Sequence, residues 1–84
     1  MDAFRVWVRP LQSASRVRVE GMNNALWLLK RVSQSFFFKS SEPVHEGADS
    51  NCSFEVLYGS DTSCSAFERL LSRIPEVKLM REPA

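Results

Sequence analysis

The side chains best suited to covalent or metal chemistry are two cysteines and a single histidine. Cys64 precedes a predicted helix, whose N-terminus would lower the pKa of its thiol, whereas Cys52 begins an alternating apolar segment. His45 lies in a polar segment with too few neighbouring ligands for a metal ion. Neither cysteine belongs to a Cys-x-x-Cys pair. We therefore expect reduced thiols, no metal site, no cofactor and no enzymatic activity.

A second candidate site lies where a short strand turns into a helix, at Glu20, Gly21, Met22, Asn23 and Asn24. The free N–H groups at a helix start and two side-chain amides could bind a carboxylate or a phosphate. The simpler interpretation is a turn glycine followed by a helix that Asn23 or Asn24 caps. This turn is nevertheless the place where we expect a small anionic metabolite.

A third candidate is a nucleic-acid surface formed by Arg5, Arg16, Arg18 and Phe37. Domains that bind single-stranded RNA stack bases on aromatic side chains of a sheet and hold phosphates with basic ones. The RNP1 pattern of glycine and aromatic residues beside Lys or Arg is missing, and Phe54 is expected to face the core. RNA binding is therefore the alternative function.

The elements that would position these residues are read from periodicity. Residues 16–20 alternate as a strand, and the apolar residues after Gly21 recur at helical spacing. The predicted core face of that helix consists of Met22, Ala25, Leu26, Leu29, Val32 and Phe36. Residues 36–39 begin a further strand. The polar segment 40–51 reads as a loop that could in part extend this strand.

The remaining elements lie at the two ends of the chain. Residues 4–8 alternate as a strand, either an edge strand in a hairpin with residues 16–20, which we favour, or an arm that pairs only in an oligomer. Residues 52–58 give the clearest strand. A helix starting near Asp61, Ser63 or Ser65 buries Phe67, Leu70, Leu71 and Ile74 and ends before Pro75, and residues 77–80 form the last strand.

This order of elements predicts a ferredoxin-like β-α-β-β-α-β fold, in which two helices cover one face of an antiparallel sheet. A possible extra strand at the N-terminus would lie at the sheet edge. The uncovered face would carry a mostly polar set of residues, namely Arg16, Arg18, Phe37, Ser53, Glu55, Leu57 and Lys78, with Trp7 as a further candidate. Such a face meets solvent, a second subunit or a ligand.

Length and composition favour one globular domain over residues 1–84, with 44% hydrophobic and 25% charged residues. The formal net charge is +1, but residues 1–40 carry seven basic and two acidic side chains, whereas residues 41–84 carry four basic and eight acidic ones. This asymmetry could mark an anion-binding surface, or a basic face that pairs with an acidic one in a dimer. The simpler interpretation is a chance distribution of solvated charges. No apolar run is long enough to cross a bilayer and no leader is evident, so we expect a cytoplasmic protein without membrane contact.

Residues 19–21 followed by a helix, together with the ending AFERLLSRIPEVKLM, resemble ACT-type regulatory domains and the YbeD-like family of small bacterial proteins with an ACT-like fold. The resemblance covers roughly residues 16–80, and Glu20-Gly21 stands where ACT domains usually have Pro-Gly or Asp-Gly. It implies an amino-acid effector bound at residues 20–24 of a subunit interface. We therefore predict a regulatory or adaptor homodimer that binds a small anionic effector or a protein partner.

Overall fold

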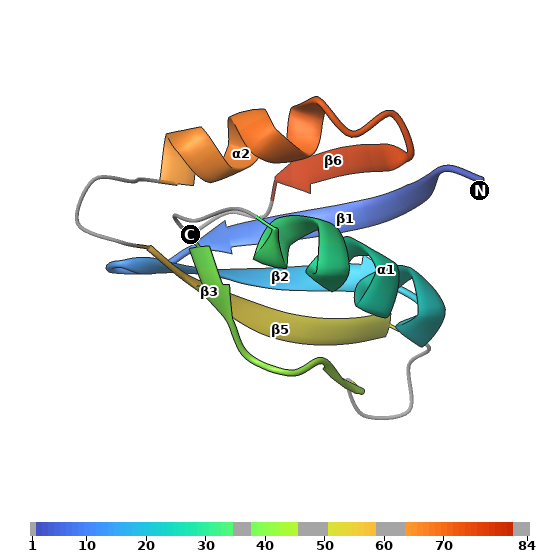
Figure 1. Ribbon diagram of the computed structural model, residues 1–84, viewed down its shortest axis with the longest axis horizontal. Helices are drawn as coiled ribbons and strands as arrows, with labels where there is room; N and C mark the ends of the chain where they lie inside the picture. Colours follow the sequence, from blue (N-terminus) through green and yellow to red (C-terminus); the bar gives the residue numbers. More distant parts are fainter. Residues whose placement is uncertain (1, 35–37, 46–50, 59–63, 82–84) are drawn as a thin grey trace.

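The computed structural model describes residues 2–34, 38–45, 51–58 and 64–81. They form an α+β fold of two helices and a six-stranded mixed sheet that is not closed (Figure 1). The elements are β1 (Phe4–Pro10), β2 (Ala14–Glu20), α1 (Met22–Ser33), β3 (Phe38–Ser40), β4 (Val44–His45), β5 (Asn51–Tyr58), α2 (Cys64–Ser72) and β6 (Val77–Arg81).

The strands are arranged in the order β3-β5-β2-β1-β6, and β4 also pairs with β5. The β1–β2 hairpin is antiparallel, with Val6 opposite Val19, and confirms the predicted hairpin within one chain. Our placement of the N-terminal strand at the edge is wrong, because β6 pairs with its other side. That pairing is parallel, with Phe4 opposite Val77, so the sheet is mixed and not antiparallel throughout.

Strand β1 also changes the ferredoxin-like order that the sequence suggested. In that arrangement the last strand would lie directly beside the first strand of the β-α-β unit, which is β2 here. Instead β1 lies between β2 and β6. Its apolar residues Phe4, Val6 and Val8 are all buried, so β1 is long and apolar enough to serve as an interior strand.

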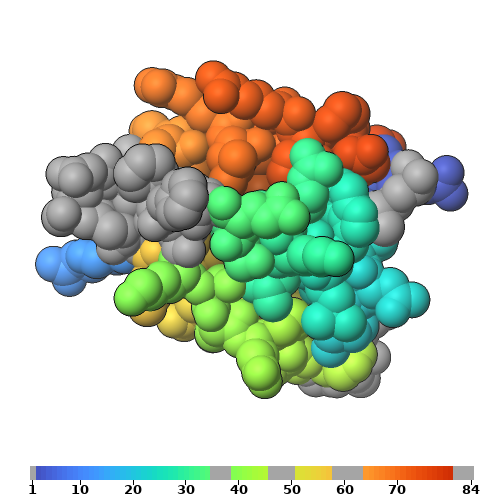
Figure 2. Space-filling model, in the orientation of Figure 1, coloured from blue at the N-terminus to red at the C-terminus, as the bar shows by residue number. Residues whose placement is uncertain are grey.

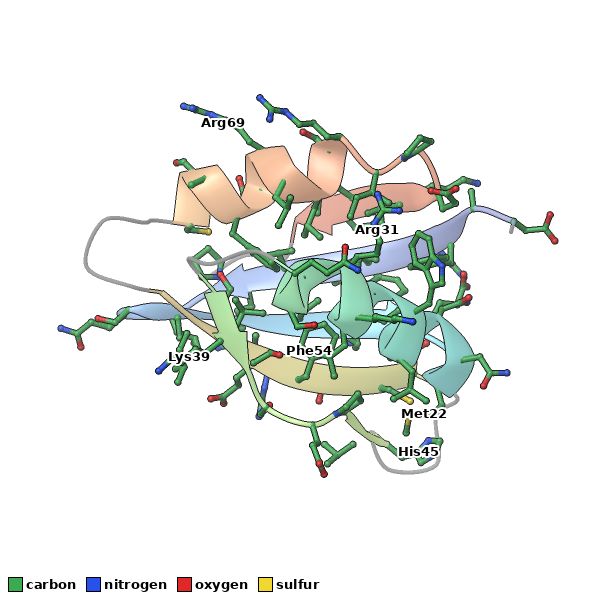
Figure 3. All side chains as sticks on the ribbon, in the orientation of Figure 1. Met22, Arg31, Lys39, His45, Phe54 and Arg69 are labelled. Atoms are coloured by element: carbon green, nitrogen blue, oxygen red, sulfur yellow. The ribbon has the colours of Figure 1, made fainter. Side chains whose placement is uncertain are left out.

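Both helices cover one face of this sheet, as predicted. The core combines the inward residues of the strands, such as Val17, Val19 and Phe54, with side chains from α1 and α2. Phe54 points from β5 into this core (Figure 3). In the space-filling view α1, α2 and the segment from β3 to β4 form the surface on this side, and the hairpin tip between β1 and β2 projects at the left (Figure 2).

Helix α1 begins at Met22 as expected but is rotated relative to the predicted face. Ala25, Leu28 and Val32 are fully buried, whereas Leu26 is 51% exposed. Positions 25, 28 and 32 lie on one side of a helix, and residue 26 lies about 100° away from residue 25. The assignment of Leu26 to the core is therefore wrong; Phe36 lies outside the described residues.

Helix α2 begins at Cys64, one residue before the latest predicted start, and Asp61 and Ser63 lie outside the described residues. Its predicted core face is confirmed: Phe67, Leu71 and Ile74 are buried and Leu70 is partly buried. None of the described helices is long and apolar enough to cross a membrane.

Strands β3 and β4 follow the same edge of β5, which confirms that residues after 40 extend the strand. Ser40 lies opposite Val56 and Val44 opposite Ser53. Residues 41–43 of the outer segment therefore lie opposite only residues 54–55 of β5. One extra residue on one strand is the definition of a β-bulge. Pro43 lies within this bulge, where a missing backbone N–H breaks no ladder hydrogen bond.

Candidate nucleic-acid interface

The sheet face opposite the helices carries a concentration of positive charge. Alternation along the paired strands places Arg5 and Arg9 of β1, Arg16 and Arg18 of β2, Lys39 of β3 and Lys78 of β6 on this side. Only Glu20 and Glu55 oppose them among the acidic residues of the described strands. We call this surface, together with Trp7, the basic face.

Trp7 lies at the middle of the basic face, directly opposite Arg18 on one side and Met80 on the other. The guanidinium carbon of Arg18 is 4.4 Å from the centroid of the Trp7 ring, and that of Arg5 is 5.5 Å away. Both distances are within the range of a cation–π contact. Trp7 and the two arginines therefore form a cationic platform on the uncovered side of the sheet.

Arg5 has a second contact, with the carboxylate of Glu20 at the end of β2. Its Nη2 and Nε donate to Glu20 Oε2 at 2.6 and 3.1 Å, and its backbone N–H donates to Oε1 at 3.3 Å. These side-chain and backbone hydrogen bonds lower the pKa of Glu20 below its ordinary value. Glu20 stays ionised at neutral pH and neutralises part of the charge of Arg5.

The turn from Glu20 to Asn24 is held by its own hydrogen bonds. Asn24 Nδ2 donates to the Glu20 carbonyl oxygen at 2.6 Å, and the Ala25 N–H donates to the Gly21 carbonyl oxygen at 3.0 Å. Gly21 is the N-cap with φ of 91°, a backbone conformation that favours glycine. The predicted cap by Asn23 or Asn24 is wrong, because α1 has no side-chain cap hydrogen bond.

This geometry bears on the predicted effector site at residues 20–24. The Glu20 carboxylate lies beside the helix start and would oppose a bound anion, and the Asn24 amide is already donating to the chain. Met22 is partly buried against the core and Asn23 is exposed. Binding of a metabolite here and assembly into a homodimer stay predictions.

The three reactive side chains lie apart from the basic face. Cys52 is buried on the helix-covered side, its Sγ is 3.6 Å from His45 Nδ1, and desolvation raises the pKa of its thiol. Cys64 is partly exposed; its Sγ accepts from Ser15 Oγ and donates to Glu68 Oε1, both at 3.6 Å. No cluster of three metal-ligating side chains occurs within the described ranges.

The structure brings together three of the four residues of the predicted nucleic-acid surface. Arg5, Arg16 and Arg18 share one face, and Phe37 lies outside the described residues. Sequence reasoning did not assign Trp7 to a binding site, although its alternation with apolar Val6 and Val8 was the signal that places it on the uncovered face. Arg9 was missed because β1 extends to Pro10, beyond the predicted end at residue 8. Lys39 was missed because β3 begins at Phe38, later than the predicted start at residue 36.

The comparisons with known proteins add no relative to this description. No family model matches the chain, and no curated protein and no solved structure matches it either.

Proposed function

We propose that this protein binds single-stranded nucleic acid through the basic face. The observation that carries the proposal is the Trp7 platform, with one guanidinium 4.4 Å and another 5.5 Å from the ring centroid. Unpaired bases stack on aromatic rings and on arginine guanidinium planes, and each stacked base contributes about 1–3 kcal/mol.

The charges around the platform support the same ligand. Arg9 and Arg16 lie opposite each other on neighbouring strands, and both are exposed. Lys39 and Lys78, which are exposed as well, extend the positive surface toward the two sides of the sheet. A sugar-phosphate backbone that crosses the strands would meet cations along its path while its bases lie on the platform.

A single strand fits this surface better than a duplex. Stacking on Trp7 requires a base whose face is free, whereas the bases of a duplex are already stacked on each other. Proteins that enter a duplex groove use a helix or a two-stranded ribbon. Here the helices α1 and α2 lie on the other side of the sheet, and β1 and β2 are interior strands.

Fluorescence anisotropy with a labelled heptauridine tests the proposal. The Trp7→Ala variant should bind about tenfold more weakly, because a base loses its stacking surface. Trp27→Phe is the matched control, since Trp27 is on α1 and contacts Phe4 on the covered side. Equal loss in both variants, or equal affinity of the wild type for a seven-base-pair duplex, would contradict binding by stacking on the basic face.

A further inference from the structure

A pocket of about 260 Å³ opens beside the basic face, between β2, β5 and the bulged segment that joins β3 to β4. Its lining includes Arg16, Ser41, Glu42, Val44, Ser53 and Glu55. The volume is just below the roughly 300–1,000 Å³ of pockets that hold drug-sized ligands. It therefore suits one flat ring system better than a complete nucleotide.

The outer wall of the pocket is held in place by the sheet. The Ser41 N–H donates to the Glu55 carbonyl oxygen at 2.9 Å, and the Glu55 N–H donates to Ser41 Oγ at 2.8 Å. Val44 then rejoins the ladder opposite Ser53. The bulge between these two attachments is thus anchored on both sides, so the pocket exists before any ligand binds.

Ser53 brings a hydroxyl group to the pocket. Ser53 is 5% exposed and lines the pocket, and its side chain makes no hydrogen bond to any residue that the structure describes. A hydroxyl group in such a position is expected to bond to a ligand or to water. Ser53 therefore offers both a donor and an acceptor to a molecule in the pocket.

The charges of the pocket differ from those of the face around it. Glu42 and Glu55 bring two carboxylates, and Arg16 brings one guanidinium. Two negative charges disfavour a phosphate inside the pocket, whereas a neutral base with N–H donors would be favoured. The backbone of a bound strand would stay on the cations outside while one base enters.

We infer that this pocket selects guanine, an inference that rests on the proposed function. A carboxylate accepts two parallel hydrogen bonds, and guanine is the common base whose Watson–Crick edge offers two adjacent donors, N1–H and the 2-amino group. Its O6 and N7 atoms accept from arginine. Glu55 or Glu42 would take the two donors, Arg16 would take the acceptors, and the exposed Val44 side chain would pack on the ring.

The test compares labelled heptauridine with heptamers that carry guanine, inosine or adenine at the fourth position. The wild type should bind the guanine heptamer about tenfold more tightly than heptauridine, as one good bidentate contact allows. Inosine, which lacks the 2-amino group, should lose most of this preference. The Glu42→Gln/Glu55→Gln variant should reduce it to about twofold or less without weakening heptauridine binding.

Glu68→Gln is the control, because it removes one carboxylate from α2, on the other side of the sheet, and should leave the preference unchanged. Equal binding of all four heptamers would overturn the guanine pocket and leave the proposed function standing. A second measurement follows the amide signals of Val44, Ser53 and Glu55 as free guanosine is added. If no heptamer binds but guanosine shifts these amide signals, the guanine pocket is supported and the proposed function is refuted. If no heptamer binds and the amide signals do not shift, both are refuted.

Discussion

The two tryptophans of this protein lie on opposite sides of one sheet, and each has at least one arginine within cation–π distance of its ring. Trp27 on α1 lies edge-on to Phe4, with ring centroids 5.8 Å apart at 89°, and Arg31 is 5.4 Å from its centroid. Trp7 on β1 has two arginines, and its neighbours across the strands are polar or exposed. Figure 3 shows Arg31 on α1, in the helix layer.

The two sides of the sheet differ in whether helices cover them. On the covered side the inward residues of the strands pack in one core with side chains from α1 and α2. This packing removes apolar area from water and so stabilises the fold. On the basic face no described element lies over Trp7 and the arginines around it. The same residue types thus stabilise the protein on one side and offer a binding surface on the other.

The largest expected effect tests whether burial, and not the residue type, defines the covered side. Leu28→Ala should lower the free energy of unfolding by about 3 kcal/mol, because it leaves a cavity under α1. Leu26→Ala, two residues away and 51% exposed, should change it by about 0.5 kcal/mol or less. Urea denaturation measures both, and similar losses would mean that α1 is rotated differently.

The next effect compares the two tryptophans directly. Trp27→Ala removes the edge-to-face contact with Phe4 and should cost about 2–4 kcal/mol of unfolding free energy. Trp7→Ala loses mainly its contacts with the arginines and should cost about 1 kcal/mol. Urea denaturation checks this order. A larger loss for Trp7→Ala would show that the basic face is part of the core.

A smaller effect concerns the charges of the basic face. In the Arg9→Gln/Arg16→Gln variant the slope of log affinity against log salt concentration for heptauridine should become shallower by about 1.4, since each lost phosphate contact on a single strand contributes about 0.7. Arg69→Gln, exposed on α2, is the control and should leave the slope unchanged. An unchanged slope in the double variant would exclude phosphate contacts there.

The smallest expected effect is a change in the pKa of Glu20 when Arg5 is replaced. Its lowered pKa means that ionised Glu20 contributes stability above the pKa of the unfolded chain, and that this contribution fades as pH falls through the folded pKa. In Arg5→Gln the pKa of Glu20 should rise only part of the way to its ordinary value, because the backbone N–H of residue 5 still donates. A carboxyl ¹³C NMR titration measures this, with Arg9→Gln as the control.

The periodicity of the sequence predicted both helices, the hairpin and which strand residues share a face. Those features follow from local alternation, which the printed residues carry. The interior place of β1 was not predictable in the same way, because the pairing of Phe4 with Val77 depends on residues near opposite ends of the described chain. The rotation of α1 was missed since Leu26 and Leu28 are equally apolar, and only packing decides between them.

The candidate site was predictable in part for similar reasons. Arg5, Arg16 and Arg18 stood at alternate positions of two strands, so their common face followed from the pattern. The cation–π platform did not follow, because it depends on the register that places Arg18 opposite Trp7. The pocket beside Glu55 depends on a bulge around Pro43, and alternation of apolar and polar residues does not predict where a bulge occurs.

The parallel pairing of β1 with β6 has a consequence for the kinetics of folding. The β1–β2 hairpin joins residues close in sequence and can form early, whereas β6 reaches β1 only after nearly the whole described chain has been brought together. Contacts of such long sequence separation slow folding, because the entropy of closing the loop is lost before the contact stabilises anything. We therefore expect docking of β6 to limit the folding rate of this sheet.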